Sequence, residues 1–548
     1  MSQFVVRGKP NEAQLYLDGI MDEVLVKKGL KPGVAQREQV TLQEILFHCL
    51  RKHPDDKYMI NGATGEVFTN AQLLNLAVPL TRALTARGAT GTQALMVTRN
   101  HQRTIATYFA VLFAGMKPFL MDPNYTIHEL SHFLKLIEPR TIFCDREFYA
   151  DMQEMYKDSN GMTPTIVVVD DEGTLEEFSQ GHSDDLDTLK FPPSHPEDTV
   201  MYLPTSGSSG LPKAAQMTQR GLIAQLPACW TYFSKFPTPT DLAMILTTIQ
   251  WMTFTMLIQA CPVYRISLLL SPKKSTVEHV TEMLETYKPT WTFLGPAFAS
   301  NLVVTINPEQ LKSLQTLILL GAPATPELMS ALQAKLPKHT HLCNGYGTTE
   351  AQGFIAIPDY EAPFNSNGWV YNFIHYKIVD DDGQDLGLNQ TGELYIKGPS
   401  MFTGYYKNEE TTKESFTEDG WYKTGDAFHV DENERISFVI RKKFSFKYQG
   451  CHVAPEEVER VIETVAGVSE SFVCGTDKGP AAAVVLRKGS AVSREDIKQA
   501  VNATLSAHKR LHGGVVFVES LPHTHSGKLK RVDCSKLVTE LASSGLCL

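Results

Sequence analysis

The sequence predicts an α/β protein with a large, multi-subdomain N-terminal domain of parallel-rich sheets and a small α+β C-terminal domain. Three observations predict this class: the length, the alternation of apolar strand-like runs with helical patterns, and a change of texture late in the chain. The chain has 548 residues, whereas single hydrophobic cores stop growing near roughly 250–300 residues. We therefore expect a multidomain protein of the size of an enzyme.

Alternating elements support the parallel sheets. Residues 93–97 read as a strand, residues 104–114 as a helix and residues 141–143 as the next strand. The apolar runs at 165–169 and 313–320 are further strands of the same kind. Strands that alternate with helices are typical of a parallel α/β sheet.

The pattern of predicted strands, helices and turns changes after about residue 390. Residues 393–396 alternate as a strand, and turns are frequent from there to residue 433. From Arg441 onward the pattern predicts a helix at 455–465, a strand at 481–486 and a helix at 494–505. We therefore predict an N-terminal domain of residues 1–440 and a C-terminal domain of residues 441–548.

Composition excludes several classes of partner. The formal charge is −10, and no basic run suggests a nucleic-acid face. The nine cysteines are scattered without the close spacing of a zinc or redox motif, which fits reduced thiols in an intracellular, cytoplasmic protein.

Residues 242–264 carry no charge and are long enough to span a bilayer, but they include four threonines, two glutamines and a proline. We predict a buried strand, a loop and a core helix there, and no transmembrane segment.

The strongest motif is the run Thr205-Ser206-Gly207-Ser208-Ser209-Gly210-Leu211-Pro212-Lys213, which follows an apolar strand at 200–203. Glycines allow backbone N–H groups to approach phosphate oxygens, and a lysine adds a point charge. The spacing is not that of a Walker A loop, which ends in Gly-Lys-Ser/Thr. The alternative is a hydroxyl-rich turn without a ligand.

This loop closely matches the signature of the adenylate-forming superfamily, which includes acyl-CoA synthetases, plant coumarate–CoA ligases and beetle luciferases. The chain resembles that family over nearly its whole length, because further motifs follow in the family's order. The resemblance implies that residues Thr205 to Gly210 and Lys213 bind ATP or AMP. It also implies that the C-terminal domain is mobile and rotates between two half-reactions.

Two further motifs resemble the family's nucleotide site. In Gly345-Tyr346-Gly347-Thr348-Thr349-Glu350 the resemblance implies that Tyr346 lies near adenine, Thr349 contacts phosphate and Glu350 holds magnesium. Mg²⁺ typically takes one or two protein carboxylates and completes its shell with phosphate oxygens and water. The turn Gly321-Ala322-Pro323 resembles the adenine-side turn.

Motifs in the last third of the chain complete the resemblance. Asp426, in Trp421-Tyr422-Lys423-Thr424-Gly425-Asp426, resembles the ribose acceptor, and Arg441 falls where the family has an arginine near the ribose and the hinge. Lys447 and Gly450 resemble the loop that the family presents to coenzyme A. Lys528, in Ser526-Gly527-Lys528, resembles the catalytic lysine that bridges the acid's carboxylate and the α-phosphate. A mobile cation suits that role because charge builds on those oxygens as pyrophosphate leaves.

The match breaks at four positions. Met252 replaces a family histidine that lines the acyl site, and Leu320 replaces a glycine before the Gly-Ala-Pro turn. Ile440 stands where an acidic hinge residue is common, and Ala214 follows the signature lysine in place of glycine. Trp251, Met252, Phe254 and Leu320 are therefore expected to build an apolar acyl pocket.

The leading hypothesis is an ATP-dependent acid–thiol ligase that activates a fatty or aromatic acid as acyl-AMP and transfers it to coenzyme A. Its cofactors and co-substrates are then ATP, Mg²⁺ and coenzyme A. One alternative is a luciferase-like oxygenase, and another is a catalytically degenerate adenylate-binding regulator, for which Met252, Leu320 and Ile440 are the evidence. The resemblance also allows a peroxisomal location, although the end of the sequence matches no Ser-Lys-Leu signal.

Overall fold

The computed structural model describes residues 12–123, 127–157, 164–171, 173–205, 213–228, 241–358, 362–380, 382–441, 444, 446–448, 451–453, 455–476, 478–505, 507–523 and 529–543. These residues divide into two compact units. The large unit contains Val5–His375 and Lys397–Tyr422, and the small unit contains Tyr376–Ile396 and Lys423–Leu548. The predicted domain boundary after Ile440 stays a prediction.

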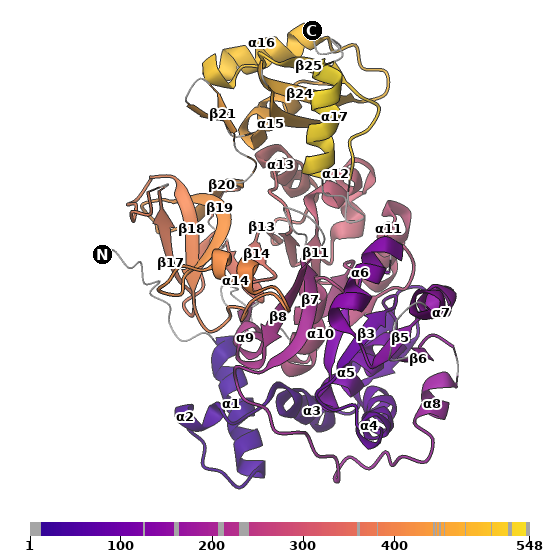
Figure 1. Cartoon of the computed structure of the whole chain (residues 1–548). Helices are drawn as coiled ribbons and strands as arrows, with labels where there is room; N and C mark the ends of the chain where they lie inside the picture. Colours follow the sequence, from indigo (N-terminus) through magenta and orange to yellow (C-terminus); the bar gives the residue numbers. More distant parts are fainter. Residues whose placement is uncertain are drawn as a thin grey trace. The chain divides into compact units, whose positions relative to one another are not determined.

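The first sheet of the large unit has seven strands in the order β13-β12-β11-β9-β10-β1-β2. Strands β11 and β13 of this sheet are labelled in Figure 1. All neighbours pair in parallel except β1 and β2. In that spatial order the strands are His341–Asn344, Thr316–Leu319, Trp291–Leu294, Leu242–Ile245, Ser267–Leu270, Lys57–Asn61 and Val67–Thr69. Strands β9, β11, β12 and β13 are buried along their whole length, as expected of parallel strands covered on both faces.

The second sheet of the large unit has the order β6-β5-β3-β4-β7-β8. It is parallel except at β8, which returns antiparallel to β7. Its strands are Thr165–Val168, Thr141–Cys144, Gln93–Val97, Lys117–Leu120, Thr199–Thr205 and Lys213–Thr218. A smaller antiparallel sheet follows, made of β14 (Tyr346–Thr348), β15 (Gly353–Ile357) and β16 (Trp369–Val370).

Helices connect these strands, and hydroxyl residues mark several of their starts. Thr41 accepts a hydrogen bond from Glu44 N at 3.2 Å while the Glu44 carboxylate accepts one from Thr41 N at 2.8 Å, which forms a capping box. The helices of the large unit are α1 Glu12–Lys27, α2 Val34–Arg37, α3 Leu42–Lys52, α4 Asn70–Ala86, α5 Gln102–Phe113, α6 Ile127–Ile137, α7 Tyr149–Lys157, α8 Thr174–Phe178, α9 Gln219–Gln225, α10 Met252–Tyr264, α11 Val277–Tyr287, α12 Pro296–Thr305, α13 Pro326–Lys335 and α14 Glu409–Ser415.

The small unit contains two principal sheets. One has the order β17-β18-β19-β20, made of His375–Val379, Gly392–Lys397, Tyr422–Val430 and Ile436–Arg441. The other is β23-β24-β25, made of Val468–Thr476, Gly479–Leu486 and Gly514–Phe517. The hairpin β21–β22 (Phe446–Tyr448 and Cys451–Val453) and helices α15 (Pro455–Glu463), α16 (Arg494–Thr504) and α17 (Arg531–Ser543) complete it.

The structure confirms the α/β class with parallel-rich sheets in a large unit and a small α+β unit. The charge-free segment 242–264 forms β9 and α10, as predicted. Within the described part of the chain, no helix is long and apolar enough to cross a membrane. The strand predicted at 313–320 is shorter, Thr316–Leu319, because Leu314 N donates to Leu311 O and closes a turn just before it.

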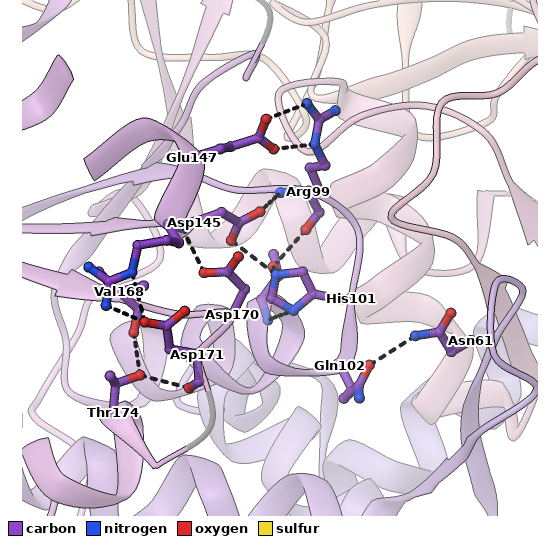
Figure 2. A network of polar contacts seen from close by, with 12 residues as sticks. Asn61, Arg99, His101, Gln102, Asp145, Glu147, Val168, Asp170, Asp171 and Thr174 are labelled. Carbon is purple, nitrogen blue, oxygen red and sulfur yellow. Dashed lines mark hydrogen bonds and ion pairs between the residues drawn. The ribbon is translucent and has the colours of Figure 1, made fainter. Parts of the chain in front are cut away.

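A polar network fills the carboxyl ends of β3, β5 and β6, on the side of the second sheet away from β7 (Figure 2). His101 accepts from Thr104 N through Nδ1 at 3.3 Å, so its Nε2 carries the proton that Asp145 Oδ1 accepts at 3.0 Å. Asp145 Oδ2 accepts from Arg99 N at 2.7 Å. Both His101 and Asp145 are buried. Their polar atoms form hydrogen bonds with one another. This network therefore stabilises the packing of the segments that follow β3 and β5.

Replacing Asp145 with alanine is expected to destabilise the large unit by about 1–3 kcal/mol, the cost of one buried donor without an acceptor. The change leaves Arg99 N–H without its acceptor and leaves His101 Nε2 with Thr104 Oγ1, at 3.2 Å, as its remaining partner. Calorimetric melting would show the loss as a transition lowered by several degrees. Glu147→Ala is the control, because Glu147 pairs with Arg99 while 48% exposed and should change stability by less than about 1 kcal/mol. Equal melting temperatures for the two variants would contradict a stabilising role of the Asp145 network.

Candidate active site

Two chain reversals meet at the carboxyl ends of β12 and β13. Leu319 pairs with Asn344 in parallel register, so Gly321 and Gly345 follow neighbouring strands at one edge of the sheet. Gly321 has φ +87°, a left-handed conformation that glycine adopts without strain. Gly345 N donates to Leu319 O at 3.0 Å, which joins the two turns. Ligands of open α/β sheets bind outside the carboxyl ends of strands, so this edge is a candidate nucleotide site.

Close backbone approach explains the glycines of the second motif. A Cβ on Gly347 would lie 2.4 Å from Gly353 O, so a side chain at this position would push β14 away from β15. A Cβ on Gly345 would lie 2.8 Å from Leu320 Cδ2. Tyr346 and Thr349 are half-buried beside these glycines. The motif is therefore built by the β14–β15 pairing.

Glu350 is the last residue of this motif and contacts Tyr405. The Tyr405 hydroxyl donates to Glu350 Oε1 at 2.8 Å, and Phe402 N donates to Glu350 O at 2.8 Å. The Lys213 ammonium lies over the Tyr405 ring, 4.9 Å from its centroid. Lys213 and Glu350, which come from separate motifs, are thus brought to the same tyrosine.

Lys213 and Thr205 are the two ends of the first motif. They pair directly across the β7–β8 hairpin. Ser206, Gly207, Ser208, Ser209 and Gly210 lie outside the described residues, so their predicted contacts stay predictions. The hairpin follows the carboxyl end of β7, which is where a phosphate-binding loop of an α/β sheet is expected.

Gln352 is a supporting residue that sequence reasoning missed. It is fully buried with φ +57°, accepts from Thr218 N at 2.9 Å and donates to Thr218 Oγ1 at 2.9 Å and to Met401 O at 3.0 Å. A Cβ on Gly221 would lie 2.2 Å from Gln352 Nε2, so α9 must present a glycine to it. Gln352 therefore ties the Glu350 turn to the end of β8. Nothing in the local pattern singles it out, because its partners Met401 and Thr218 are 49 and 134 positions away.

The predicted acyl-pocket residues come from two places. Trp251 is half-buried at the N-cap of α10, whereas Met252 and Phe254 are buried in its first turn. Leu320 follows β12 and packs over Gly345. The ring of Phe354 is 6.1 Å from that of Phe293 on β11 and would be 3.3 Å from a Gly345 Cβ. Apolar side chains thus surround the Gly345 turn, and the assignment of the four predicted residues to an acyl wall stays a prediction.

Asp426 and Arg441 are brought together in the small unit. They are register partners on β19 and β20, and Arg441 donates to both Asp426 oxygens, at 2.5 Å from Nε and 2.8 Å from Nη2. Asp426 is 1% exposed. Each carboxylate oxygen has two lone pairs, so an acceptor site for a hydroxyl donor remains compatible with this pairing. Ile440 is buried opposite Ala427.

The thiol-transfer and catalytic-lysine motifs are described in part. Lys447 lies on β21 opposite His452, while Gly450 lies outside the described residues. Lys528 also lies outside them, so its catalytic role stays a prediction. On either side of that motif, His523 and Leu529 form a β-bridge.

A buried ion pair follows the lysine motif. Arg531, at the start of α17, donates to both oxygens of Glu459 on α15, at 3.0 and 2.5 Å. Glu459 Oε1 also accepts from Val473 N at 2.8 Å. Burial raises the pKa of Glu459 to about 7, and the Arg531 charge opposes that rise. The pair fixes α17 against α15 within the small unit.

Glu350 fits one part of a magnesium site. A single half-buried carboxylate is what a Mg²⁺ bound mainly through phosphate oxygens and water requires. Among the residues that the structure describes, no group of three or more His, Cys, Asp and Glu side chains forms a metal cluster.

Comparisons with known proteins agree with this architecture. A profile of AMP-binding enzymes matches residues 46–406, and one of the AMP-binding enzyme C-terminal domain matches residues 457–528. A luciferin 4-monooxygenase of Photuris pensylvanica is 28% identical over 520 residues, covering 90% of this chain and 94% of that protein. The 4-coumarate–CoA ligase CCL1 of Humulus lupulus is 27% identical over 551 residues, covering 96% and 99%.

Solved structures show the same fold. ATP-bound MatB from Rhodopseudomonas palustris has a TM-score of 0.82 at 23% identity, covering 92% of this chain and 100% of that one. The o-succinylbenzoate CoA synthetase MenE from Bacillus subtilis, in complex with AMP, has a TM-score of 0.78 at 21% identity, covering 90% and 98%. At these identities the likeness concerns the fold alone.

The fold is that of an α/β protein with a candidate nucleotide site at the carboxyl ends of β12 and β13. The profile matches, which extend over more than half of the sequence, are more specific. The chain belongs to the AMP-binding enzyme family, the adenylate-forming group whose members include CoA ligases and luciferases.

Arg531→Met is expected to destabilise the small unit, and more so at high pH. Removing one partner of a buried ion pair costs about 3–5 kcal/mol. Without Arg531 the pKa of Glu459 rises further above the value of about 7 that it has in the wild type. Both folded proteins hold the Glu459 proton up to about pH 7, so the stability deficit of the variant grows from about pH 7 to 9, where the wild type releases that proton and the variant retains it.

Thermal melting at both ends of this pH range measures the effect. Lys530→Met is the matched control, because Lys530 is an exposed lysine one position earlier. An Arg531→Met deficit that is the same at both pH values would rule out the buried carboxyl as its cause.

Proposed function

We propose that this chain uses ATP to activate a carboxylic acid as an acyl-adenylate and then transfers the acyl group to coenzyme A. In the first step a carboxylate oxygen bonds to the α-phosphorus of ATP, the bond from that phosphorus to the bridging oxygen breaks, and pyrophosphate leaves. In the second step the thiol sulfur bonds to the acyl carbon, AMP leaves with the electron pair, and the thiol proton is released. The use of ATP and coenzyme A is consistent with the CoA ligases among the relatives of this chain.

One observation carries the proposal: Lys213 and Glu350 converge on Tyr405, within the unit that also holds the turns after β12 and β13. A cation there is suited to phosphate oxygens, and the carboxylate is suited to a Mg²⁺ shared with the nucleotide. Such a metal ion would neutralise charge on the phosphates. Thr205, Gly321, Ala322, Pro323, Gly345, Tyr346, Gly347 and Thr349 are the remaining described candidates of the large unit.

Lys528 supplies the mobile cation of adenylation in this proposal, and Lys447 and Gly450 flank the path of the thiol. Asp426 accepts the ribose hydroxyls, with Arg441 as its charge partner. Rotation of the C-terminal domain between the half-reactions lets one cleft serve both. The proposed boundary of that movement is at residues 440 and 441.

The competing function is a luciferase-like oxygenase, and the observation that favours it is the similarity to a luciferin 4-monooxygenase. Both functions begin with adenylation, so pyrophosphate release does not separate them. Thioester formation with coenzyme A separates them. A ligase would form the thioester, whereas an oxygenase would consume O₂ and an adenylated luciferin-type acid. A regulator that only binds nucleotide would release no pyrophosphate with any acid.

Lys528→Ala is expected to lower acid-dependent pyrophosphate release by about 100-fold or more, the range of a positioned charge in the transition state. ATP binding and melting temperature should stay near wild-type values. Isotope-labelled pyrophosphate release, measured over a panel of acids with coenzyme A present, checks both the activity and the residue. An unchanged rate in the variant would remove Lys528 from the mechanism.

Chain length is expected to govern acid preference. Trp251, Met252, Phe254 and Leu320 form an apolar wall in the proposed pocket, and each buried methylene contributes about 0.8 kcal/mol. Specificity constants should therefore rise from acetate to medium-chain, long-chain or aromatic acids. Met252→Ala should shift the preferred length upward by opening the wall. A flat preference, or one for acetate, would refute the pocket assignment without affecting the nucleotide site.

A further inference from the structure

Tyr405 lies between the two opposite charges of the candidate site. Its hydroxyl donates to Glu350 Oε1 at 2.8 Å, and its ring faces the Lys213 ammonium at 4.9 Å. A cation within about 6 Å of an aromatic ring is attracted by the negative face of that ring. One side chain thus contacts the carboxylate through its edge and the ammonium through its face.

The backbone around Tyr405 is fixed against β8. Tyr405 forms a β-bridge with Ala215, while Tyr406 N donates to Ala214 O at 2.8 Å and Gln216 N donates to Gly404 O at 3.0 Å. The strand that begins with Lys213 therefore also positions Tyr405. The pairing of residues 404–406 with β8 therefore places the Tyr405 ring near the Lys213 side chain.

Further contacts fix the Tyr405 side chain from its other sides. Tyr405 N donates to Thr412 Oγ1 at 2.9 Å, and the ring of Phe402 packs edge-on against the Tyr405 ring at 4.9 Å. Phe402 N in turn holds the Glu350 carbonyl. Tyr405 is 8% exposed, so its hydroxyl has little access to water. The hydroxyl and its carboxylate acceptor are therefore preorganised.

The Tyr405 hydroxyl is a neutral donor, because a phenol is uncharged at physiological pH. A neutral donor positions Glu350 without cancelling its charge, in contrast to a lysine or arginine. Among the described residues Lys213 and Glu350 form no ion pair with each other. Each charge remains available to a ligand.

We propose that Tyr405 is a positioning residue that holds Glu350 for a divalent cation and Lys213 for the nucleotide, and keeps the two charges from pairing. The proposal rests on the proposed function, because it assigns the ligands of both charges. The proposal assigns separate roles to two groups of the Tyr405 side chain. The hydroxyl serves the carboxylate, and the ring serves the ammonium.

Two substitutions separate these parts. Tyr405→Phe removes the hydroxyl and keeps the ring face, whereas Tyr405→Leu removes both. Tyr406→Phe is the matched control: its ring lies 5.0 Å from that of Tyr202, and its hydroxyl accepts from Gln93 Nε2 at 3.5 Å. Glu350→Gln is the reference for loss of the carboxylate charge.

Calorimetric titration with an α,β-methylene analogue of ATP, with and without Mg²⁺, tests the proposal without turnover. In wild type Mg²⁺ should increase the affinity for the analogue. Tyr405→Phe should reduce that increase by about 10-fold, equivalent to about 1.4 kcal/mol, and leave the Mg²⁺-free affinity unchanged. Tyr405→Leu should lower the Mg²⁺-free affinity as well. Glu350→Gln should abolish the increase.

Several outcomes would overturn the inference. These are a Tyr405→Phe variant that titrates like Tyr406→Phe, one that loses affinity equally with and without Mg²⁺, or a Glu350→Gln variant with full Mg²⁺ dependence. Melting curves accompany each titration, and the hydroxyl assignment stands on Tyr405→Phe if Tyr405→Leu fails to fold. If the titrations give the expected pattern but the protein forms no acyl-adenylate, the proposed reaction is wrong and the positioning role of Tyr405 is supported.

Discussion

The parallel pairing of β12 with β13 is the constraint on which the candidate nucleotide site depends. Parallel strands end at the same edge, so the Gly321 turn and the Gly345 turn become neighbours although 24 positions separate them in the sequence. The β14–β15 hairpin then leaves that edge directly and carries Glu350 in the turn that joins its strands. An out-of-register β13 would move Gly345 and Glu350 together, because no flexible connector lies between them. Main-chain hydrogen bonds thus bring these turns together.

A second constraint links that edge to the other sheet of the large unit. Gln352 joins the Glu350 turn to Thr218 at the end of β8, and the backbone of Tyr405 pairs with the middle of the same strand. Strand β8 begins with Lys213. Two independent connections therefore set the position of Glu350 relative to Lys213. Buried polar contacts of this kind are costly to leave half-formed, so they favour one arrangement of the turn.

The sequence predicted those features whose cause is local. Apolar runs indicated β3, β5 and β6 almost to the residue, and the charge-free segment 242–264 was correctly divided into β9 and α10. Glycine motifs indicated the turns after β12 and β13. Tyr405 and Gln352 were not predicted, because their roles arise from partners far away along the chain. The buried pair of Arg531 and Glu459 was missed for the same reason: its two halves lie 72 positions apart.

Asp426 in the small unit and Glu350 in the large unit differ in how their carboxylates are held, and the difference suits different ligands. Asp426 is paired with the guanidinium of Arg441 through both oxygens, so its charge is largely balanced and it is suited to accept hydrogen bonds from neutral hydroxyls. Glu350 is held by a neutral phenol, which fixes its orientation and leaves its charge in place. A divalent cation is attracted by the second arrangement far more than by the first. The choice of Tyr405 over an arginine beside Glu350 is therefore itself an argument for a cation at that carboxylate.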